Sequence, residues 1–276
     1  MKISKLQLKN FKRFTDLTID NIPSETKLVL LIGSNGSGKS TVFDAFSFIN
    51  NRIKRDIGLA EDYTDYYRKN KKVASEVSIK FDNNDEVILP DNSYIDIKLP
   101  EETFYGRTSY RQIPKLTRTA LGQNKYASSE KDFDKDSDRP KYFIERDNRF
   151  ENDIEKITEA ILKEFFRGNQ STEKIRERYI DPINKALKNI FGEGNGTKFE
   201  LIEILPPIEG KTAQINFRKG VSEIHYNYLS AGEKEVFNLL INIHSRVSMY
   251  QNTIYFFDEI DLHLNTKLQY NFLKEI

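Results

Sequence analysis

The fold is decided by the stretch Leu28-Val-Leu-Leu-Ile-Gly-Ser-Asn-Gly-Ser-Gly-Lys39-Ser40, in which an apolar run leads into a glycine-rich loop. The loop, Gly33 to Ser40, matches the pattern G-x-x-x-x-G-K-[ST] in full. The run Leu28 to Ile32 predicts a strand that is buried on both faces. Apolar residues at helical spacing follow the loop and predict a helix. A strand, a glycine loop and a helix in this order are the setting that a phosphate-binding loop requires.

The chemistry of the loop follows from its residue types. Glycines let backbone N–H groups converge on phosphate oxygens, and the start of the following helix adds partial positive charge. We expect Lys39 to reach the β- and γ-phosphates of ATP, and Ser40 to bind Mg²⁺. The alternative is an ordinary glycine turn that caps a helix, which the full match in the right setting disfavours. The predicted nucleotide-binding residues of the loop are Asn35, Gly36, Ser37, Gly38, Lys39, Ser40 and Thr41.

A second apolar strand is predicted over Thr253 to Phe257, and two carboxylates follow it. We expect Asp258 to hold Mg²⁺ directly or through water, and Glu259 to polarise the attacking water. Glu259 and Lys39 are therefore the predicted catalytic residues. A strand that merely ends in a solvated turn is the alternative, and the presence of the phosphate loop argues against it.

The segment Leu229 to Glu235, with the sequence Leu-Ser-Ala-Gly-Glu-Lys-Glu, precedes a predicted helix. Ser230 lies where that helix begins, so its hydroxyl and the free N–H groups behind it form an anion site. The loop from Gly33 to Ser40 already holds the γ-phosphate of its own chain. Ser230 would therefore serve the nucleotide of another protomer, unless it acts only as a helix cap.

These motifs resemble those of a known family. Leu229 to Glu235 resembles the signature motif of ABC-type ATPases, and Tyr255 to Glu259 resembles their Walker B strand. The opening residues Met1 to Phe14 resemble the first strand of the RecF, SMC and OLD (overcoming-lysogenization-defect) group. Asp258 to Leu264 resembles the DEPExHLHP-type motif of OLD-like ATPases. Phe104 to Arg111 resembles a segment of related bacterial ATPases. The chain thus resembles an ABC-type P-loop ATPase, closest to the OLD-like ATPases of bacterial anti-phage defence.

The resemblance implies a head-to-tail homodimer with two ATP molecules between its subunits. It implies that Ser230 and Gly232 of one subunit close on the γ-phosphate held by Lys39 of the other. Gln112 matches the Q-loop and Asp261 the D-loop. Lys12 and Arg13 correspond to basic residues near the nucleotide, although a solvated hairpin explains them equally well.

The sequence also departs from the family pattern. Position 260 is Ile where OLD-like ATPases usually have Pro, and position 231 is Ala where most signatures have Gly. A switch histidine is expected on a strand beyond the last helix, and His225, His244 and His263 do not match it by position. We therefore expect the chain to be a C-terminally truncated head.

Composition limits the remaining choices. The chain has 276 residues, with 43 Lys+Arg, 42 Asp+Glu and a formal net charge of +1, which excludes a polybasic nucleic-acid binder. With 0 Cys, thiol nucleophiles and cysteine metal sites are excluded. The longest apolar runs fall far short of the roughly 20 residues of a membrane helix. We accordingly predict a cytoplasmic protein with no membrane partner.

The predicted fold class is α/β. An ABC-type head would combine a mostly parallel core sheet flanked by helices with an antiparallel β-subdomain and a helical insert. We predict one ATPase domain over residues 1–276. Its parts are an N-terminal β and Walker A lobe (1–50), a β-rich insert (51–149) with a mobile loop (122–141), a helical insert (150–192), and a signature and Walker B lobe (193–276).

The predicted function is an ATP-hydrolysing, Mg²⁺-dependent head that controls an effector, such as a nuclease outside this chain, in anti-phage defence or DNA maintenance. An ATP-dependent clamp with little hydrolysis and a RecF-like DNA repair ATPase remain alternatives. An arm-bearing SMC protein is disfavoured because no heptad repeat is sustained. The basic clusters Arg52 to Arg55 and Arg68 to Lys72 are candidates for local DNA contact, or are solvated faces.

Overall fold

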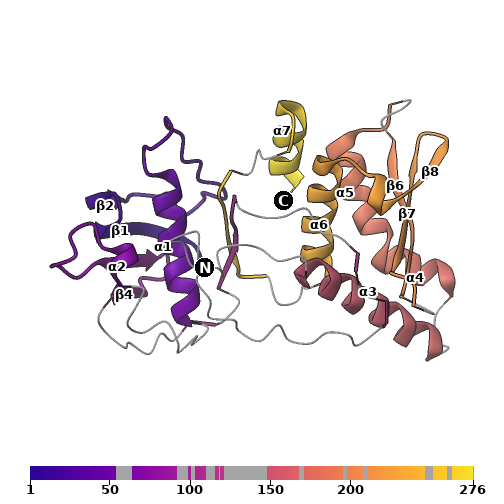
Figure 1. The fold of residues 1–276 in the computed structure, drawn as a ribbon, viewed down its shortest axis with the longest axis horizontal. Helices are drawn as coiled ribbons and strands as arrows, with labels where there is room; N and C mark the ends of the chain where they lie inside the picture. The colour runs from indigo at the N-terminus through magenta and orange to yellow at the C-terminus, as the bar shows by residue number, and fades with distance from the viewer. Residues whose placement is uncertain are drawn as a thin grey trace. The chain divides into compact units, whose positions relative to one another are not determined.

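The protein is described here from a computed structural model, in which the chain divides into two compact units. The helices and strands of each unit are labelled in Figure 1. No helix in the described part of the chain is long and apolar enough to cross a membrane. The structure describes residues 1–53, 64–91, 99–100, 103–109 and 251–258 of unit 1, and 116–117, 119–120, 148–167, 171–194, 198–207, 210–245, 259 and 263–275 of unit 2.

Unit 1 contains a four-stranded antiparallel sheet and the helix that follows the phosphate loop. The strands are β1 (Ile3–Phe11), β2 (Phe14–Ile19), β3 (Glu76–Phe81) and β4 (Glu86–Pro90), in the order β2-β1-β3-β4. The helix is α1 (Lys39–Ile53), and a short helix, α2 (Thr64–Tyr67), lies close to the turn between β1 and β2.

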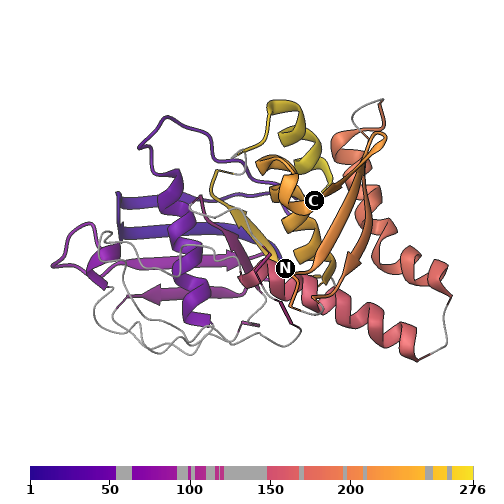
Figure 2. The same ribbon diagram turned by 45° about the vertical axis from the view of Figure 1, so that its right-hand side comes forward.

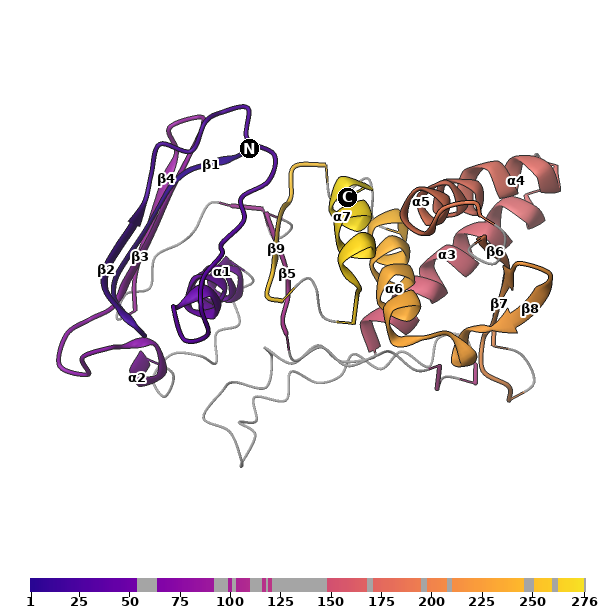
Figure 3. The same cartoon turned by 90° about the horizontal axis from the view of Figure 1, so that it is seen from above.

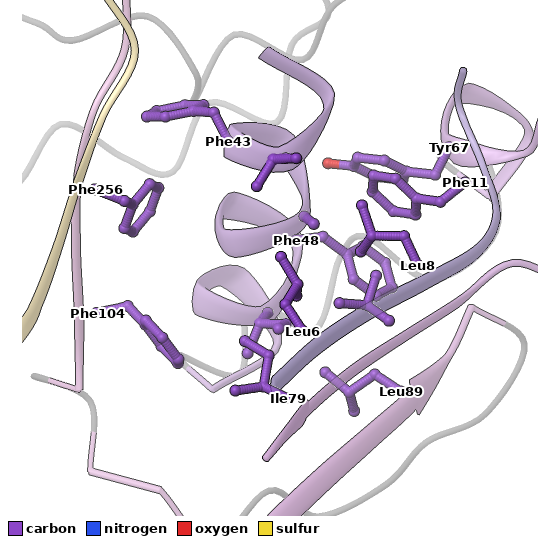
Figure 4. Packing of buried hydrophobic residues seen from close by; sticks show 14 of the residues in the cluster. Leu6, Leu8, Phe11, Phe43, Phe48, Tyr67, Ile79, Leu89, Phe104 and Phe256 are labelled. Atoms are coloured by element: carbon purple, nitrogen blue, oxygen red, sulfur yellow. The ribbon is translucent and has the colours of Figure 1, made fainter. Parts of the chain in front are cut away.

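Helix α1 buries two faces, and this fixes the position of the loop at its N-terminus. Val42, Ala45 and Ile49 belong to the same apolar cluster as Leu6, Leu8 and Ile79 of the antiparallel sheet. On its other side, the Phe43 ring lies 4.9 Å from the Phe256 ring, and the Phe46 ring 5.9 Å from the Phe104 ring. Figures 3 and 4 show α1 between the antiparallel sheet and the pair β5 and β9.

The parallel part of unit 1 is made by β5 (Phe104–Arg107) and β9 (Ile254–Phe257). Phe104 pairs with Ile254 and Arg107 with Phe257, so the two strands end at the same edge. Gly106 permits their packing, because a Cβ there would lie 2.3 Å from the Phe256 ring. The residues that directly follow β5 and β9 therefore lie close together beside α1.

The predicted buried strand over Leu28 to Ile32 is wrong in this structure. No strand is assigned there, and the five side chains are exposed, with Ile32 at 90% and Leu31 at 42% of their full area. A strand needs a neighbour that pairs with its N–H and C=O groups, and none of the described strands pairs with this run. Apolar character identified the segment but did not supply that partner.

Unit 2 combines helices with a three-stranded antiparallel sheet (Figure 2). Stacked and edge-on aromatic rings join the sheet to the helices: the Phe217 ring lies 4.9 Å from Phe199 and 4.8 Å from Phe237, and the Phe150 ring 4.9 Å from Tyr226. The elements are α3 (Asn148–Phe166), α4 (Thr172–Tyr179), α5 (Asp181–Phe191), β6 (Phe199–Leu205), β7 (Gln214–Lys219), β8 (Ser222–His225), the 3-10 helix η3 (Tyr226–Tyr228), α6 (Ala231–Ser245) and α7 (Thr266–Glu275).

The α/β class, with parallel and antiparallel sheets and flanking helices, is confirmed. Among the described strands, parallel pairing is found between β5 and β9, and the other two sheets are antiparallel. The proposed mobile loop (122–141) lies outside the described residues. The division into lobes and inserts remains a prediction.

Candidate nucleotide site

The glycine loop of unit 1 has a backbone that only glycine adopts easily. Gly36 and Gly38 have φ values of 77° and 107°, and the Ser37 N–H donates to the Ser34 carbonyl at 3.1 Å. A Cβ on Gly38 would lie 2.4 Å from the Phe14 ring, so the loop turns directly over β2. Asn35 and Ser37 are exposed between these glycines, whereas the Thr41 side chain is buried on the first turn of α1.

Lys39 is the first residue of α1, and its side chain lies back over the loop. Its Nζ donates to the carbonyl oxygens of Gly33 at 2.7 Å and Ser34 at 3.1 Å. These contacts place a positive charge at the glycine loop, whose residues from Gly33 to Ser37 are exposed. A phosphate group that binds the loop can replace the carbonyl oxygens as the acceptor of these hydrogen bonds.

Asp258 lies at the junction of the loop helix and the two parallel strands. The Ser40 hydroxyl donates to its Oδ1 at 3.1 Å, although the two residues are 218 positions apart in the sequence. The Ser109 hydroxyl donates to Oδ2 at 3.0 Å, and the Asp258 N–H donates to the Arg107 carbonyl at 2.9 Å. The Asp258 side chain is nearly buried, since the residue keeps 6% of its accessible area.

The donor set of this junction fits Mg²⁺. A serine hydroxyl and a carboxylate are hard oxygen ligands, and Mg²⁺ in nucleotide sites is typically held by one or two protein oxygens together with phosphate oxygens and water. Ser40 and Asp258, both predicted from the sequence as metal ligands, are brought within one hydrogen bond of each other. Their roles as ligands remain a prediction that this geometry supports.

Ser109 is a site residue that the sequence patterns do not identify. It belongs to the segment Phe104 to Arg111, whose sequence signals only a resemblance to related ATPases. A usable signal was its place two residues after β5, one residue beyond the position that corresponds to Asp258 after β9. Recognising it required the parallel register of β5 and β9, which the sequence does not state.

The two basic residues between β1 and β2 have different surroundings. Lys12 forms an ion pair with the buried carboxylate of Asp44 on α1, and its Nζ donates to the Tyr66 hydroxyl at 2.8 Å. Arg13 lies at the loop instead, with its Nη1 3.4 Å from where a Cβ of Gly36 would stand. Lys12 therefore anchors the hairpin to α1, and Arg13 is the residue of the two that is close to the predicted phosphate site.

The predicted signature segment lies in unit 2, where Ser230 precedes α6. The Ser230 hydroxyl donates to Glu233 Oε2 at 2.9 Å, the Ser230 N–H donates to the same oxygen at 2.8 Å, and the Glu233 N–H lies 3.4 Å from the hydroxyl oxygen. This reciprocal arrangement is a capping box. The expectation that Ser230 begins the helix is thus met, and the hydroxyl already has a partner within its own segment.

Glu233 has an unusual electrostatic environment for a capping residue. Its residue keeps 8% of its accessible area, and Lys219 on β7 donates to its Oε1 at 2.6 Å. Burial acts to raise the pKa of Glu233, but the hydrogen bonds from Lys219 and Ser230 outweigh it and hold the pKa below its ordinary value. The carboxylate is therefore charged at neutral pH.

Gly232 is placed under a packing constraint. A Cβ on this residue would lie 2.6 Å from the backbone oxygen of His263 and 3.3 Å from the Leu264 side chain. His263 and Leu264 therefore pack directly on the first turn of α6. Any larger residue at position 232 would displace one of the two.

The remaining predicted residues are placed only in part. Glu259 is exposed directly after Asp258 and has a φ of 54°, which is unusual for a non-glycine residue. Gln112 and Asp261 lie outside the described residues, so the predicted Q-loop and D-loop stay predictions. A search of the described residues finds no group of three or more His, Cys, Asp or Glu that could hold a metal ion.

Comparison with known proteins identifies relatives. The chain matches the RecF/RecN/SMC N terminal domain over residues 2–276. It is 36% identical over 94 residues to a DNA double-strand break repair Rad50 ATPase of Sulfolobus acidocaldarius, and 33% identical over 90 residues to a chromosome partition protein Smc of Bordetella petrii. These alignments cover 34% and 31% of this chain but only 10% and 8% of the relatives, so the chain spans about a tenth of their length.

Solved structures give a weaker likeness. An SmcHead bound to the C-winged helix domain of ScpA aligns with 98% of this chain and 92% of its own, at a TM-score of 0.45 and 14% identity. An SMC head domain from Thermotoga maritima aligns with 100% of this chain and 85% of its own, at a TM-score of 0.42 and 15% identity.

Proposed function

Because the chain belongs to the RecF/RecN/SMC N terminal domain family, we propose that it is an ATPase head that binds Mg²⁺ and ATP and acts in DNA maintenance. The observation that carries this proposal is the 3.1 Å hydrogen bond between Ser40 and Asp258. These two residues come from opposite ends of the chain, and their meeting supports a single site that contains both the phosphate loop and the acidic strand end.

Each residue of the site has a proposed task. The N–H groups of the loop and the Lys39 ammonium bind the phosphates of ATP, and Ser40 and Asp258 hold Mg²⁺. When bound, Mg²⁺ supplies positive charge that offsets the charge of the phosphate oxygens. Glu259, exposed after Asp258, orients a water molecule and accepts its proton. Arg13, close to Gly36, adds a second positive charge at the loop.

The second half of the site is proposed to come from another copy of the chain. The start of α6 offers the Ser230 hydroxyl and the positive end of the helix dipole, which suit a phosphate anion. The loop already serves the phosphates of its own chain, so a head-to-tail homodimer is the arrangement in which both features serve one nucleotide.

An ATP-dependent clamp with little hydrolysis is the alternative function. It would use the same loop and the same dimer, and would differ only in turnover. Steady-state phosphate release separates the two proposals when the chain is measured beside Glu259→Gln, with ATP-dependent dimerisation followed by sedimentation. We expect release above background for the unchanged chain and at background for the variant. Background release by both, with dimerisation intact, would establish the clamp.

A role in DNA maintenance is supported by the relatives, one named for double-strand break repair and the other for chromosome partition. In unit 1, the cluster Arg68 to Lys72 offers a local basic surface. Arg68 is committed to the buried carboxylate of Asp91, whereas Lys71 and Lys72 are exposed. The side chains of Arg52 to Arg55 lie outside the described residues.

Salt-dependent binding of duplex DNA tests that surface. Changing Lys71 and Lys72 to Glu should weaken binding at all sequences and lower the slope of log affinity against log salt by about 2, because each phosphate contact contributes about 0.9. Changing Lys198 and Lys211 in unit 2 provides a control with the same loss of charge. An unchanged slope in the first variant would place DNA contact elsewhere.

Control of an effector nuclease in anti-phage defence is the finer proposal. It rests on the resemblance of Asp258 to Leu264 to OLD-like ATPases. We place the effector outside residues 1–276, in a partner or another part of the protein. Metal-dependent cleavage of DNA by this chain alone would contradict that placement.

A further inference from the structure

Three side chains from two elements of unit 2 form a chain of hydrogen bonds at the start of α6. Lys219, the last residue of β7, donates to Glu233 Oε1 at 2.6 Å, and the other carboxylate oxygen accepts from the Ser230 hydroxyl at 2.9 Å. The Ser230 N–H also donates to that oxygen, at 2.8 Å. Lys219 is thus connected to Ser230 through a single carboxylate.

The hydroxyl of Ser230 has one proton, and this geometry directs it toward Glu233. The charged carboxylate can only accept, and the Glu233 N–H approaches the hydroxyl oxygen from the other side at 3.4 Å. A phosphate oxygen is also only an acceptor. For Ser230 to bind phosphate through its hydroxyl, the proton must turn from the carboxylate to the phosphate.

The negative charge of Glu233 also opposes the binding of phosphate at Ser230. Its carboxylate lies in the first turn of α6, where a phosphate of a second copy would approach, and like charges at such distances repel. The Lys219 ammonium at 2.6 Å offsets that charge. Lys219 keeps 41% of its side-chain area accessible, so it is at the surface, while Glu233 keeps 10%.

We propose that Lys219 is a positioning residue for nucleotide binding by Ser230 in the dimer, because its ammonium offsets the charge of the Glu233 carboxylate beside the Ser230 hydroxyl. This inference deepens the proposed function and rests on it. It adds a residue from β7, outside the signature segment, to the groups on which ATP-dependent dimerisation depends.

The test compares ATP-dependent dimerisation of the full chain, measured by sedimentation at fixed ATP and Mg²⁺, across a set of variants. Lys219→Met should raise the dimer dissociation constant about tenfold, the change that corresponds to one pKa unit of electrostatic coupling. Glu233→Gln should dimerise at least as tightly as the unchanged chain, and adding Lys219→Met to it should change little. Arg218→Met is the matched control, since it removes a positive charge from the adjacent position of β7.

The pH dependence of dimerisation distinguishes this role from that of an ion pair that only stabilises the fold. Lys219→Met removes the Lys219 contribution that lowers the pKa of Glu233 and leaves the hydrogen bonds from Ser230, so this pKa should rise and acid should protonate more of the carboxylate than in the unchanged chain. Dimerisation of Lys219→Met should then recover relative to the double variant, which has no carboxylate at this position and controls for protonation of ATP. A purely structural loss would not recover in acid.

The outcomes separate this inference from the proposed function. The role of Lys219 would be overturned if Lys219→Met dimerised as tightly as the unchanged chain. It would also be overturned if adding Glu233→Gln did not relieve the dimerisation defect of Lys219→Met. In both cases the proposal of an ATP-driven dimer would stand. If the unchanged chain does not dimerise with ATP, the proposed function fails, and this inference fails with it. Should Lys219→Met not fold, the Glu233→Gln variant alone decides: weaker dimerisation than the unchanged chain would overturn the inference.

Discussion

Replacing Ser109 with alanine removes the hydroxyl that donates to Asp258 Oδ2 at 3.0 Å. The substitution leaves the Ser40 contact to Oδ1 and the backbone hydrogen bond to Arg107 in place. Asp258 would still lie at the end of β9, but its carboxylate would be less firmly held. We predict that Ser109→Ala weakens the binding of Mg²⁺. The affinity for nucleotide in the absence of metal should stay about the same.

The size of the effect follows from what is lost. A hydrogen bond to a charged group contributes about 1.5–3 kcal/mol, and losing an outer partner of a metal ligand typically costs 10–100-fold in metal affinity. Ser109 is partly exposed, and water can replace some of the loss. We therefore expect the Mg²⁺ concentration at half-maximal nucleotide binding to rise about tenfold for Ser109→Ala.

Binding of a fluorescent ATP analogue, titrated with Mg²⁺ and repeated with chelator, measures this directly. Ser109→Thr keeps the hydroxyl and should resemble the unchanged chain. Ser78→Ala is a matched control, because it removes a hydroxyl that donates at 3.0 Å to Glu86, a carboxylate within the antiparallel sheet. An Mg²⁺ midpoint for Ser109→Ala equal to that of Ser78→Ala would refute the role assigned to Ser109.

Three further predictions concern stability, all measured by urea unfolding without nucleotide. Gly38→Ala should lower the free energy of unfolding by about 2–4 kcal/mol, because φ is 107° and the Cβ would meet the Phe14 ring at 2.4 Å. Gly36→Ala has 3.4 Å to its nearest neighbour and should lower the free energy of unfolding by about 1 kcal/mol. Equal losses in the two variants would contradict the packing argument. Arg68→Met should lower the free energy of unfolding by about 3–5 kcal/mol, since it removes the cation that is paired with the buried Asp91 carboxylate. Burial raises the pKa of Asp91, but Arg68 and Ser75 together lower it below its ordinary value. The stability contributed by Asp91 is therefore present at neutral pH and lost as the pH falls below about 3.9 and through the lower folded pKa. Asp91→Asn should lack that acid dependence.

Local patterns predicted the parts of the site that depend on neighbours in sequence. The glycine loop and the helix after it follow from residue types that tolerate unusual backbone angles and from apolar residues at helical spacing. The end of β9 at Asp258 and the cap at Ser230 are equally local features. For each of these, the structure gives the expected element at the expected residue.

Features that depend on pairing between distant segments were not predicted. The apolar run Leu28 to Ile32 indicated a buried strand, but burial requires a partner strand, which its own residues do not specify. Ser109 gained its contact from the parallel register of β5 with β9. Lys219 gained its contact with Glu233 from the packing of β7 on α6. Long-range contacts of single polar residues leave no periodic signal in the sequence.

The most direct test of the central claim mixes two defective chains. Lys39→Ala removes the phosphate-binding ammonium and Ser230→Arg obstructs the signature side, so neither variant alone should form an ATP-dependent dimer. In a head-to-tail dimer, a mixture restores one complete site, made of Lys39 from one chain and Ser230 from the other. We predict that sedimentation with ATP and Mg²⁺ detects dimers in the mixture but not in either variant alone. A mixture that stays monomeric while the unchanged chain dimerises would contradict a site shared between two heads.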